Sequence, residues 1–120
     1  YSIMSSPITT HILDTSVGRP AVGVAVNIER RVQGSDAVTW ESLGDGVTDA
    51  DGRVKDLLPP DTLLAGTYRI HFAIGDYFKS AGREAFYPEA TIVFEVKNPQ
   101  EHYHVPLLLN PFGFSTYRGS

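Results

Sequence analysis

Hydrophobic and polar residues alternate with a period of two along most of this chain. Three segments show the pattern most clearly, namely Val22–Ile28, Tyr68–Ile74 and Ile92–Val96. Because successive side chains of a β-strand point to opposite faces, each segment is predicted to be a strand with one buried face. Weaker alternation predicts further strands at Thr9–Asp14, Thr39–Leu43, Arg53–Lys55, His102–Asn110 and Phe114–Arg118.

Residues typical of turns separate these segments. Gly, Pro, Asn and Asp gather at Val17–Pro20, Gly34–Asp36, Asp49–Gly52, Pro59–Asp61 and Asn98–Pro99. Short strands at this spacing predict an all-β sandwich or barrel of about eight strands. One short helix is expected over Asp76–Ala81, with Gly82 as its C-cap. With no repeat along the chain, residues 1–120 are expected to form one domain.

Composition narrows the class of protein. A chain of 120 residues has room for a single hydrophobic core. The absence of cysteine excludes a disulfide scaffold, a thiol nucleophile and thiolate metal ligands. The net charge is −4 and lysine and arginine form no cluster, so a nucleic-acid partner is not expected. The apolar runs are too short to span a bilayer, so no membrane partner is expected.

The amino terminus has two interpretations. Met4 is the single methionine, and Tyr1–Ile3 precede it. Either Met4 is the natural start and the first three residues were added, or the chain continues upstream. Residues 1–6 are therefore expected to be additional to the domain or flexible.

His102 and His104 form the first candidate for chemistry. They lie two apart on a predicted strand, so both face away from the apolar set Tyr103, Val105, Leu107 and Leu109. Pro106 predicts that this strand is interrupted or lies at a sheet edge. Three interpretations stay open: solvated surface histidines, a zinc site completed by His11 or His71, or acid–base catalysis.

The other candidates lie on separate segments. His11 shares a predicted strand face with Thr9, and a plain hydrogen-bonded strand histidine is the simpler alternative. His71 is expected to be structural. Arg53 follows the acidic turn Asp49–Gly52, which lacks the spacing of a calcium loop. Its guanidinium suits a carboxylate, imide or urea-like group, whereas the simpler alternative pairs it with Asp49 or Asp51.

No Gly-x-Ser-x-Gly elbow and no glycine-rich phosphate loop occur in the sequence. A serine-triad hydrolase and a nucleotide enzyme are therefore not expected. The residues alone predict a small β-sandwich with a His/Arg site.

Several segments together resemble one family. Thr10–Thr15, His102–Leu109 and Ser115–Ser120 are similar to the signature segments of the 5-hydroxyisourate hydrolases, the transthyretin-related enzymes of purine metabolism. Thr48–Arg53 and Phe86–Glu89 also resemble family segments. The likeness runs from Ser6 to Ser120 and departs at the Arg31–Val38 loop and the first few residues. Transthyretin itself lacks the terminal segment and the His-Tyr-His sequence.

The resemblance implies a transthyretin-like sandwich of two sheets. It implies a homotetramer built as a dimer of dimers, with active sites in the channel between the dimers. The implied reaction, a step of urate degradation, opens a cyclic amide of 5-hydroxyisourate to give 2-oxo-4-hydroxy-4-carboxy-5-ureidoimidazoline. No cofactor and no metal are implied.

The resemblance also implies the site residues. The implied catalytic residues are His11, Arg53, His104 and Ser120. The implied substrate-binding residues are His11, Arg53, Tyr117, His102 and Arg118. His104 or His11 would be the general base and Arg53 the oxyanion donor, while Tyr117 and Ser120 would orient substrate or water. Which histidine is the base, and whether Ser120 transfers a proton, stay open.

Two further functions compete with the hydrolase. One is a transthyretin-like carrier of small ligands without catalysis. The other is a zinc-bridged assembly that uses His102 and His104 at a subunit contact. For location, the resemblance favours the cytoplasm and leaves the peroxisome open, although the terminal Arg118–Ser120 is not a peroxisomal address of the Ser-Lys-Leu type.

Overall fold

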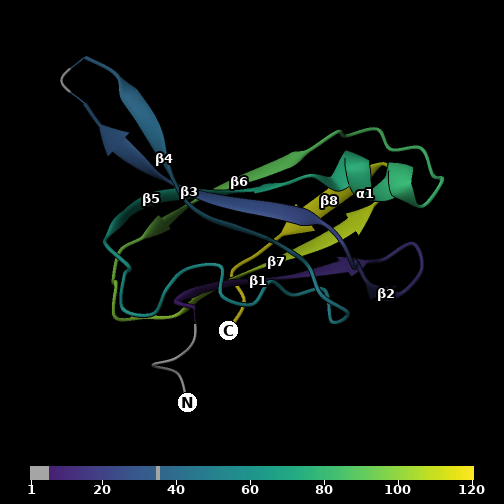
Figure 1. Ribbon diagram of the computed structural model, residues 1–120, viewed down its shortest axis with the longest axis horizontal. Coiled ribbons are helices and arrows are strands. Elements are labelled where there is room, and N and C mark those ends of the chain that lie inside the picture. Colours follow the sequence, from purple (N-terminus) through teal and green to yellow (C-terminus); the bar gives the residue numbers. More distant parts are fainter. Residues whose placement is uncertain (1–5, 35) are drawn as a thin grey trace.

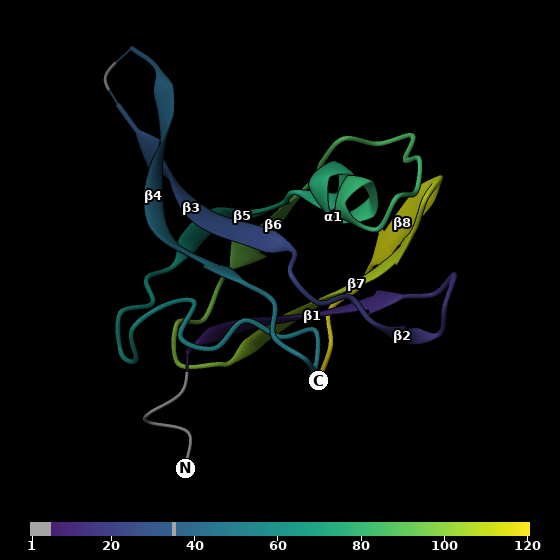
Figure 2. The same ribbon diagram turned by 45° about the vertical axis from the view of Figure 1, so that its right-hand side comes forward.

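The protein folds into two four-stranded sheets that pack face to face (Figures 1 and 2). The computed structural model describes residues 6–34 and 36–120. The first sheet, called sheet A, has the order β2 (Arg19–Pro20), β1 (Ile8–Asp14), β7 (Tyr103–Asn110) and β8 (Gly113–Thr116). Sheet B has the order β4 (Val38–Val47), β3 (Ala25–Gln33), β5 (Gly66–Phe72) and β6 (Ala90–Val96). The all-β sandwich of about eight strands is therefore confirmed.

The core lies between the sheets and is built from the alternating apolar positions. On β7 the predicted inner face is buried throughout. The fully buried side chains of the core include Ile8, Ile12, Ile28, Tyr68, Ile70, Phe72, Phe78, Leu107 and Leu109. Because each strand buries every second residue, the polar residues between them lie on the outer faces of the sheets.

Both ends of the described chain are hydrogen-bonded to the rest of the fold. Ser6 is buried, and its hydroxyl donates to the Ile8 carbonyl and accepts the Leu58 N–H. The expectations for Tyr1–Ser5, including those for Met4, lie outside the described residues, as does Ser35 of the predicted turn. The carboxyl end returns to lie beside β1 in both views (Figures 1 and 2).

The hairpin of β3 and β4 is longer than the alternation predicted. It extends beyond the body of the sandwich (Figure 1). The apolar period stops after Ile28, where the ladder carries a bulge, and the outer half of the hairpin is mostly exposed. Arg30 pairs with Glu41 at 3.1 Å across the two strands. Strands that pair outside the core need no alternation of apolar and polar residues. The alternation therefore did not predict the outer parts of β3 and β4.

Two other strand predictions were wrong. Arg53–Lys55 is not a strand, because Arg53 makes a single isolated bridge to His11. Conversely, Arg19–Pro20 was predicted within a turn and forms the two-residue strand β2, paired with Leu13 and Asp14. Such short pairings depend on neighbouring backbone and leave no periodicity in the sequence.

The single predicted helix is present but begins earlier than expected. Helix α1 spans Ile74–Ser80, and Ile74 continues the apolar alternation of β5 as a buried first helical residue. Gly82 has φ +69° and closes the helix as predicted, since its N–H donates to Lys79 and the Arg83 N–H donates to Phe78. In the part of the chain that the structure describes, no helix is long and apolar enough to cross a membrane.

Pro106 was expected to interrupt its strand or place it at an edge, and it does neither. Strand β7 is continuous and lies between β1 and β8. The Pro106 carbonyl accepts from the Thr116 hydroxyl at 2.7 Å, beyond the last backbone pair of β8 with β7. The ladder resumes where His104 pairs with Gly119. The missing N–H therefore falls between the last β7–β8 pair and the isolated His104–Gly119 bridge.

Candidate active site

The centre of the candidate site is the outer face of sheet A where β1 and β7 run in parallel. Their register places Thr9 opposite His104 and His11 opposite Pro106. The side chains of Thr9, His11 and His104 are half-buried on this face. The Thr9 Oγ1 atom lies 2.8 Å from His104 Nδ1 and 3.1 Å from His102 Nε2. The outward orientation predicted for both histidines is therefore confirmed, and Thr9 joins them.

A tight turn brings Arg53 to the same face. The backbone of Arg53 bridges to His11, and the Ile12 N–H donates to the Gly52 carbonyl at 2.8 Å. Gly52 has φ +75°, and a Cβ there would come 2.4 Å from the Ile12 carbonyl oxygen. Glycine is therefore required for the turn to lie against β1 and to place Arg53 beside His11.

Asp49 shapes this turn through the backbone. Its carboxylate accepts the N–H groups of Asp51 and Arg53 at 2.9 and 3.1 Å. The same two hydrogen bonds lower the pKa of Asp49. Among the described residues no ion pair joins the Arg53 guanidinium to Asp49 or Asp51. The acidic turn thus orders the loop and leaves the Arg53 side chain available to a ligand.

The carboxyl-terminal segment closes on His104 from the other side. The Gly119 N–H donates to the His104 carbonyl at 2.9 Å. A Cβ at position 119 would come 2.5 Å from His104 Cδ2 and 3.3 Å from Pro106 Cγ. The side chains of Tyr117 and Ser120 on this segment are exposed. Backbone contact with His104 thus brings this segment to the site, where Tyr117 lines a hollow together with His104.

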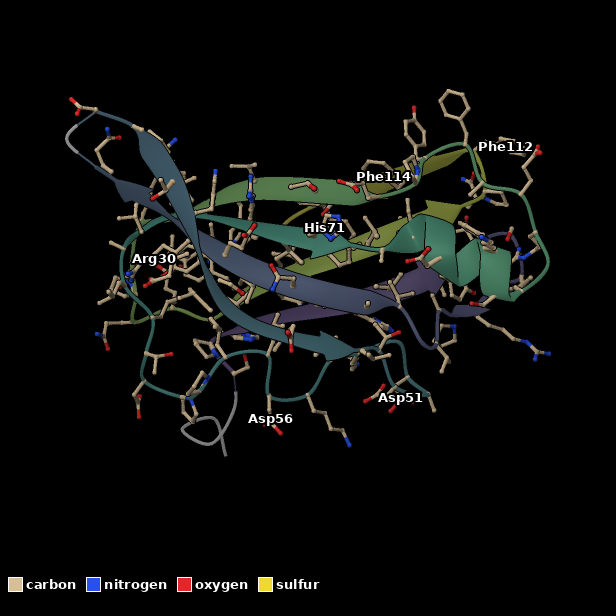
Figure 3. All side chains as sticks on the ribbon, turned by 45° about the horizontal axis from the view of Figure 1, so that its top comes forward. Arg30, Asp51, Asp56, His71, Phe112 and Phe114 are labelled. Carbon is tan, nitrogen blue, oxygen red and sulfur yellow. The ribbon has the colours of Figure 1, made fainter. Side chains whose placement is uncertain are left out.

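Two other histidine and arginine candidates are directed elsewhere. Arg118 donates to Glu101 at 2.9 Å and stacks on the Tyr103 ring, with 4.5 Å from its Cζ to the ring centroid. His71 lies on sheet B, 3.3 Å from the Glu89 carboxylate (Figure 3). The structure therefore gathers His11, Arg53, His102 and His104 but leaves His71 apart from them.

The electrostatics of the site act on His104. Burial lowers the pKa of His104 below its ordinary value of 6.5, and the positive charges of Arg53, His102 and His11 act in the same direction. A lowered pKa keeps the imidazole neutral at pH 7, the state in which it can accept a proton. His104 is thus suited to the role of a general base.

Two hollows adjoin this cluster. One has a volume of about 280 Å³ and is lined by Thr9, Thr10 and Arg53 together with Ser6 and Val54–Asp56. Asp56 marks the position of this loop in Figure 3. The other has about 270 Å³ and lies between β6 and the terminal segment, with His104, Tyr117 and Arg118 in its wall. Both are slightly smaller than the ~300 Å³ at which ligand pockets usually begin.

The residues present do not form the zinc site considered above. Within residues 6–34 and 36–120, no three histidine, aspartate or glutamate side chains lie together in a group that could hold a metal ion. His102 and His104 instead share the hydroxyl of Thr9.

Sequence reasoning missed Thr9 and Gly119 as parts of the site. Thr9 shares the predicted outward face of His11, but nothing local shows that it lies beside His104, 95 residues away. Gly119 looks like a flexible terminal glycine until His104 is found against it. In both cases the signal is the long-range pairing of β7 with its neighbours.

Comparison with known proteins agrees with this architecture. The family model described as "HIUase/Transthyretin family" matches residues 8–119. The 5-hydroxyisourate hydrolase of Salmonella typhi is 44% identical over 116 residues, which cover 97% of this chain and 82% of that protein.

Solved structures give two further matches. The Klebsiella pneumoniae 5-hydroxyisourate hydrolase aligns with a TM-score of 0.78 and 40% identity, covering 94% of this chain and 98% of the other. Sea bream transthyretin, solved in complex with thyroxine, aligns with a TM-score of 0.86 and 33% identity over 95% of each chain. The fold is thus shared by an enzyme and a thyroxine-binding protein, and the residues of the site must distinguish between the two functions.

Proposed function

The chain belongs to the HIUase/Transthyretin family, and from that membership we propose that it hydrolyses 5-hydroxyisourate, opening a cyclic amide to give 2-oxo-4-hydroxy-4-carboxy-5-ureidoimidazoline. One observation carries this assignment beyond the family. Among the described residues, the neutral imidazole of His104 lies on the same open sheet face as His11 and Arg53, and the Arg53 guanidinium makes no ion pair there. A base and an oxyanion donor are what hydrolysis of an activated carbonyl needs.

The first step is attack by water on the ring carbonyl. A histidine accepts a proton from the water as the new C–O bond forms. Collapse of the tetrahedral intermediate then breaks the ring C–N bond, and the same proton passes to the departing nitrogen. His104 is favoured as the base because burial and neighbouring positive charge lower its pKa. His11 is then placed to hold the substrate beside Arg53.

Arg53 has the second role. Its guanidinium presents parallel N–H donors that fit the imide-like edge of the substrate and the oxyanion that develops during attack. The backbone of Arg53 is fixed by Asp49 and by the bridge to His11, so the point from which its exposed side chain reaches the substrate is set before substrate binds. A fixed anchor of this kind reduces the reorganisation that is needed when the oxyanion develops.

The terminal segment supplies the remaining groups. Tyr117 and Ser120 offer hydroxyls that orient substrate or water, and Arg118 and His102 complete the binding surface. In the single chain the Arg118 guanidinium pairs with Glu101, so that pair must open before Arg118 can bind substrate. Of these residues, His102 is the one joined by a hydrogen-bonded neighbour to His104.

A carrier of small apolar ligands is the second candidate, and the transthyretin match favours it at the level of fold. An apolar carrier channel has no need of a cationic fork and a neutral imidazole on the same wall. The higher identity to the hydrolases than to transthyretin points the same way.

We further propose that the working form is a homotetramer arranged as a dimer of dimers. In the protomer, β6 and β8 are edge strands of sheets B and A, and residues of both strands line one hollow. Edge strands of this kind usually pair with another chain or are protected. A second copy over the open face of sheet A would enclose the shallow hollows and build a deeper site between subunits.

The deciding experiment follows the substrate itself. Urate oxidase generates 5-hydroxyisourate from urate in the cuvette, and its decay is recorded by absorbance with and without the protein. We expect decay well above the spontaneous rate, in proportion to protein concentration. An unchanged rate, together with tight binding of an aromatic ligand such as thyroxine, would replace the hydrolase with the carrier.

A further inference from the structure

The hydroxyl of Thr9 lies between two imidazoles at the centre of the site. Its Oγ1 is 2.8 Å from His104 Nδ1 and 3.1 Å from His102 Nε2. A hydroxyl has one proton to donate, so it donates to one ring and accepts from the other. The direction of this chain determines which nitrogen of His104 carries the proton.

The Thr9 hydroxyl is the hydrogen-bond partner of Nδ1 on His104, so Nε2 can act as a base only when Nδ1 carries the proton. That tautomer fixes the direction of the chain. The Thr9 hydroxyl then accepts at His104 and donates to His102, whose exposed ring can meet solvent with its other nitrogen.

Gly119 limits the ring from another side. Its backbone lies so close that a Cβ would come 2.5 Å from His104 Cδ2. The imidazole is therefore held at its Nδ1 edge by Thr9 and at its Cδ2 side by the terminal backbone. With Nδ1 hydrogen-bonded to Thr9, Nε2 is the nitrogen left to meet substrate or water.

We propose that Thr9 is a positioning residue that holds His104 with its proton on Nδ1, so that Nε2 is presented as the base. The inference rests on the proposed function for the role of His104, but the tautomer can be measured whether or not the substrate is correct. In the reaction, Nε2 accepts the proton from water while Nδ1–H stays bonded to Thr9. The hydrogen bond stabilises the imidazolium that forms, as a fixed partner does for other catalytic histidines.

The test compares Thr9→Val with Thr9→Ser. Valine keeps the shape and strand preference of threonine but removes both hydrogen bonds, whereas serine keeps the hydroxyl. We expect Thr9→Val to lower kcat by about 10- to 100-fold and Thr9→Ser to stay within about 3-fold of the unaltered protein. Thr39→Val, on the exposed part of β4, is the matched control and should leave kcat unchanged.

A pH profile separates positioning from a general loss of structure. His104 is faced by Arg53, His11 and His102, and its hollow also contains Glu95, Tyr117 and Arg118. None of these is altered in Thr9→Val. Loss of the acceptor at Nδ1 disfavours the imidazolium, so the acid limb of kcat/KM should move to lower pH in Thr9→Val and stay in place in Thr9→Ser and Thr39→Val.

Nitrogen NMR of His104 tests the inference without substrate. The unaltered protein should show the tautomer protonated on Nδ1, and Thr9→Val should lose part of that population. An unchanged tautomer and acid limb in Thr9→Val, or equal loss of kcat in both Thr9 variants, would overturn the proposal. If the unaltered protein does not hydrolyse 5-hydroxyisourate, the proposed function fails, and the NMR result still decides the role of Thr9.

Discussion

At the scale of single residues, the site depends on a neutral imidazole held beside permanent positive charge. Burial and the charge of Arg53 both lower the pKa of His104. A general base acts only when neutral, so activity is lost as the pH falls through that lowered pKa. We therefore expect kcat/KM to stay level through neutral pH and to decline only below pH 6.5, which a pH–rate profile from pH 5 to 8 would show. A decline that begins above pH 7 would contradict the assignment of His104 as base.

Arg53 gives the second residue-scale prediction. Its side chain is exposed, while its backbone makes the contacts that shape the turn. Arg53→Ala should therefore lower kcat/KM by about 10²- to 10³-fold, as loss of an oxyanion donor does, and leave the melting temperature nearly unchanged. Arg31→Ala, on the exposed hairpin, is the control and should retain full activity. Unfolding of Arg53→Ala would instead show that the guanidinium is structural.

Gly119 gives the third, through steric contact alone. A Cβ at position 119 would overlap His104 Cδ2, so either the ring or the terminal segment must move. Gly119→Ala should lower kcat by about 10-fold or more, because small misplacement of a catalytic group is costly. Gly113→Ala is the matched control, since a Cβ there meets nothing closer than 3.9 Å. Equal kinetics for the two variants would show that the terminal segment does not constrain His104.

At the scale of secondary-structure elements, the period of the hydrophobic pattern predicted most of the strands. It worked wherever one face of a strand covers the core, as on β1, β6 and β7. It stopped at Ile28, where the β3–β4 hairpin leaves the core. The alternation also assigned Ile74 to the strand that became β5, although Ile74 is the first residue of α1. A buried first residue of a helix fits an alternating pattern equally well.

A buried ion pair joins two of these elements. The Asp14 side chain at the end of β1 is fully buried and accepts from Arg83, just after α1, and from Tyr77 Oη at 2.8 Å. Burial opposes ionisation of Asp14, but the hydrogen bonds of Ser16, Arg83 and Tyr77 outweigh it and lower its pKa. Burial and the Asp14 carboxylate raise the pKa of Tyr77 to about 12. This contact therefore fixes α1 against the end of sheet A.

Arg83→Met tests that contact. Losing one partner of the buried carboxylate should lower the free energy of unfolding by about 1–3 kcal/mol at pH 7, measured by urea denaturation. Because the folded pKa of Asp14 is lowered, the contribution is present above its unfolded value of 3.8 and is lost as the pH falls through the folded value. The effect should thus shrink in acid. Arg30→Met, which breaks the exposed pair with Glu41, should cost less than about 1 kcal/mol.

At the scale of the whole molecule, the pairing of strands far apart in the sequence brings the site residues together, and local sequence patterns do not reveal that pairing. Four of the residues expected from the resemblance, His11, Arg53, His102 and His104, do lie together. They come from β1, the loop that follows β4, the residue just before β7, and β7 itself. The alternation had placed the histidines on outward faces, but it contains no information on which strands are neighbours. The parallel pairing of β1 with β7 therefore could not be predicted from the residues, and Thr9 was missed with it.

Exposed aromatic side chains beside an edge strand lead to a prediction about subunit assembly. Phe86, Tyr87 and Phe114 form a cluster of aromatic rings, in which Phe86 is 69% exposed. Phe112, just before β8, is 67% exposed, and Figure 3 shows it together with Phe114. The Phe86 N–H donates to the Pro111 carbonyl, which fixes this cluster beside the start of the edge strand β8. Large apolar side chains next to an open sheet edge are typical of an interface between subunits.

We therefore expect a native mass of about 53 kDa, four times the 13.2 kDa of one chain, by analytical ultracentrifugation. Phe112→Ser should raise the protein concentration below which the assembly dissociates. Val38→Ser, which also replaces an exposed apolar side chain but lies on the hairpin, should not. If the site is enclosed between subunits, activity per chain should fall over the same range of dilution at which the assembly dissociates. A monomer with undiminished activity per chain would show that the open face of sheet A works alone, and the shallow hollows beside His104 would then be the complete site.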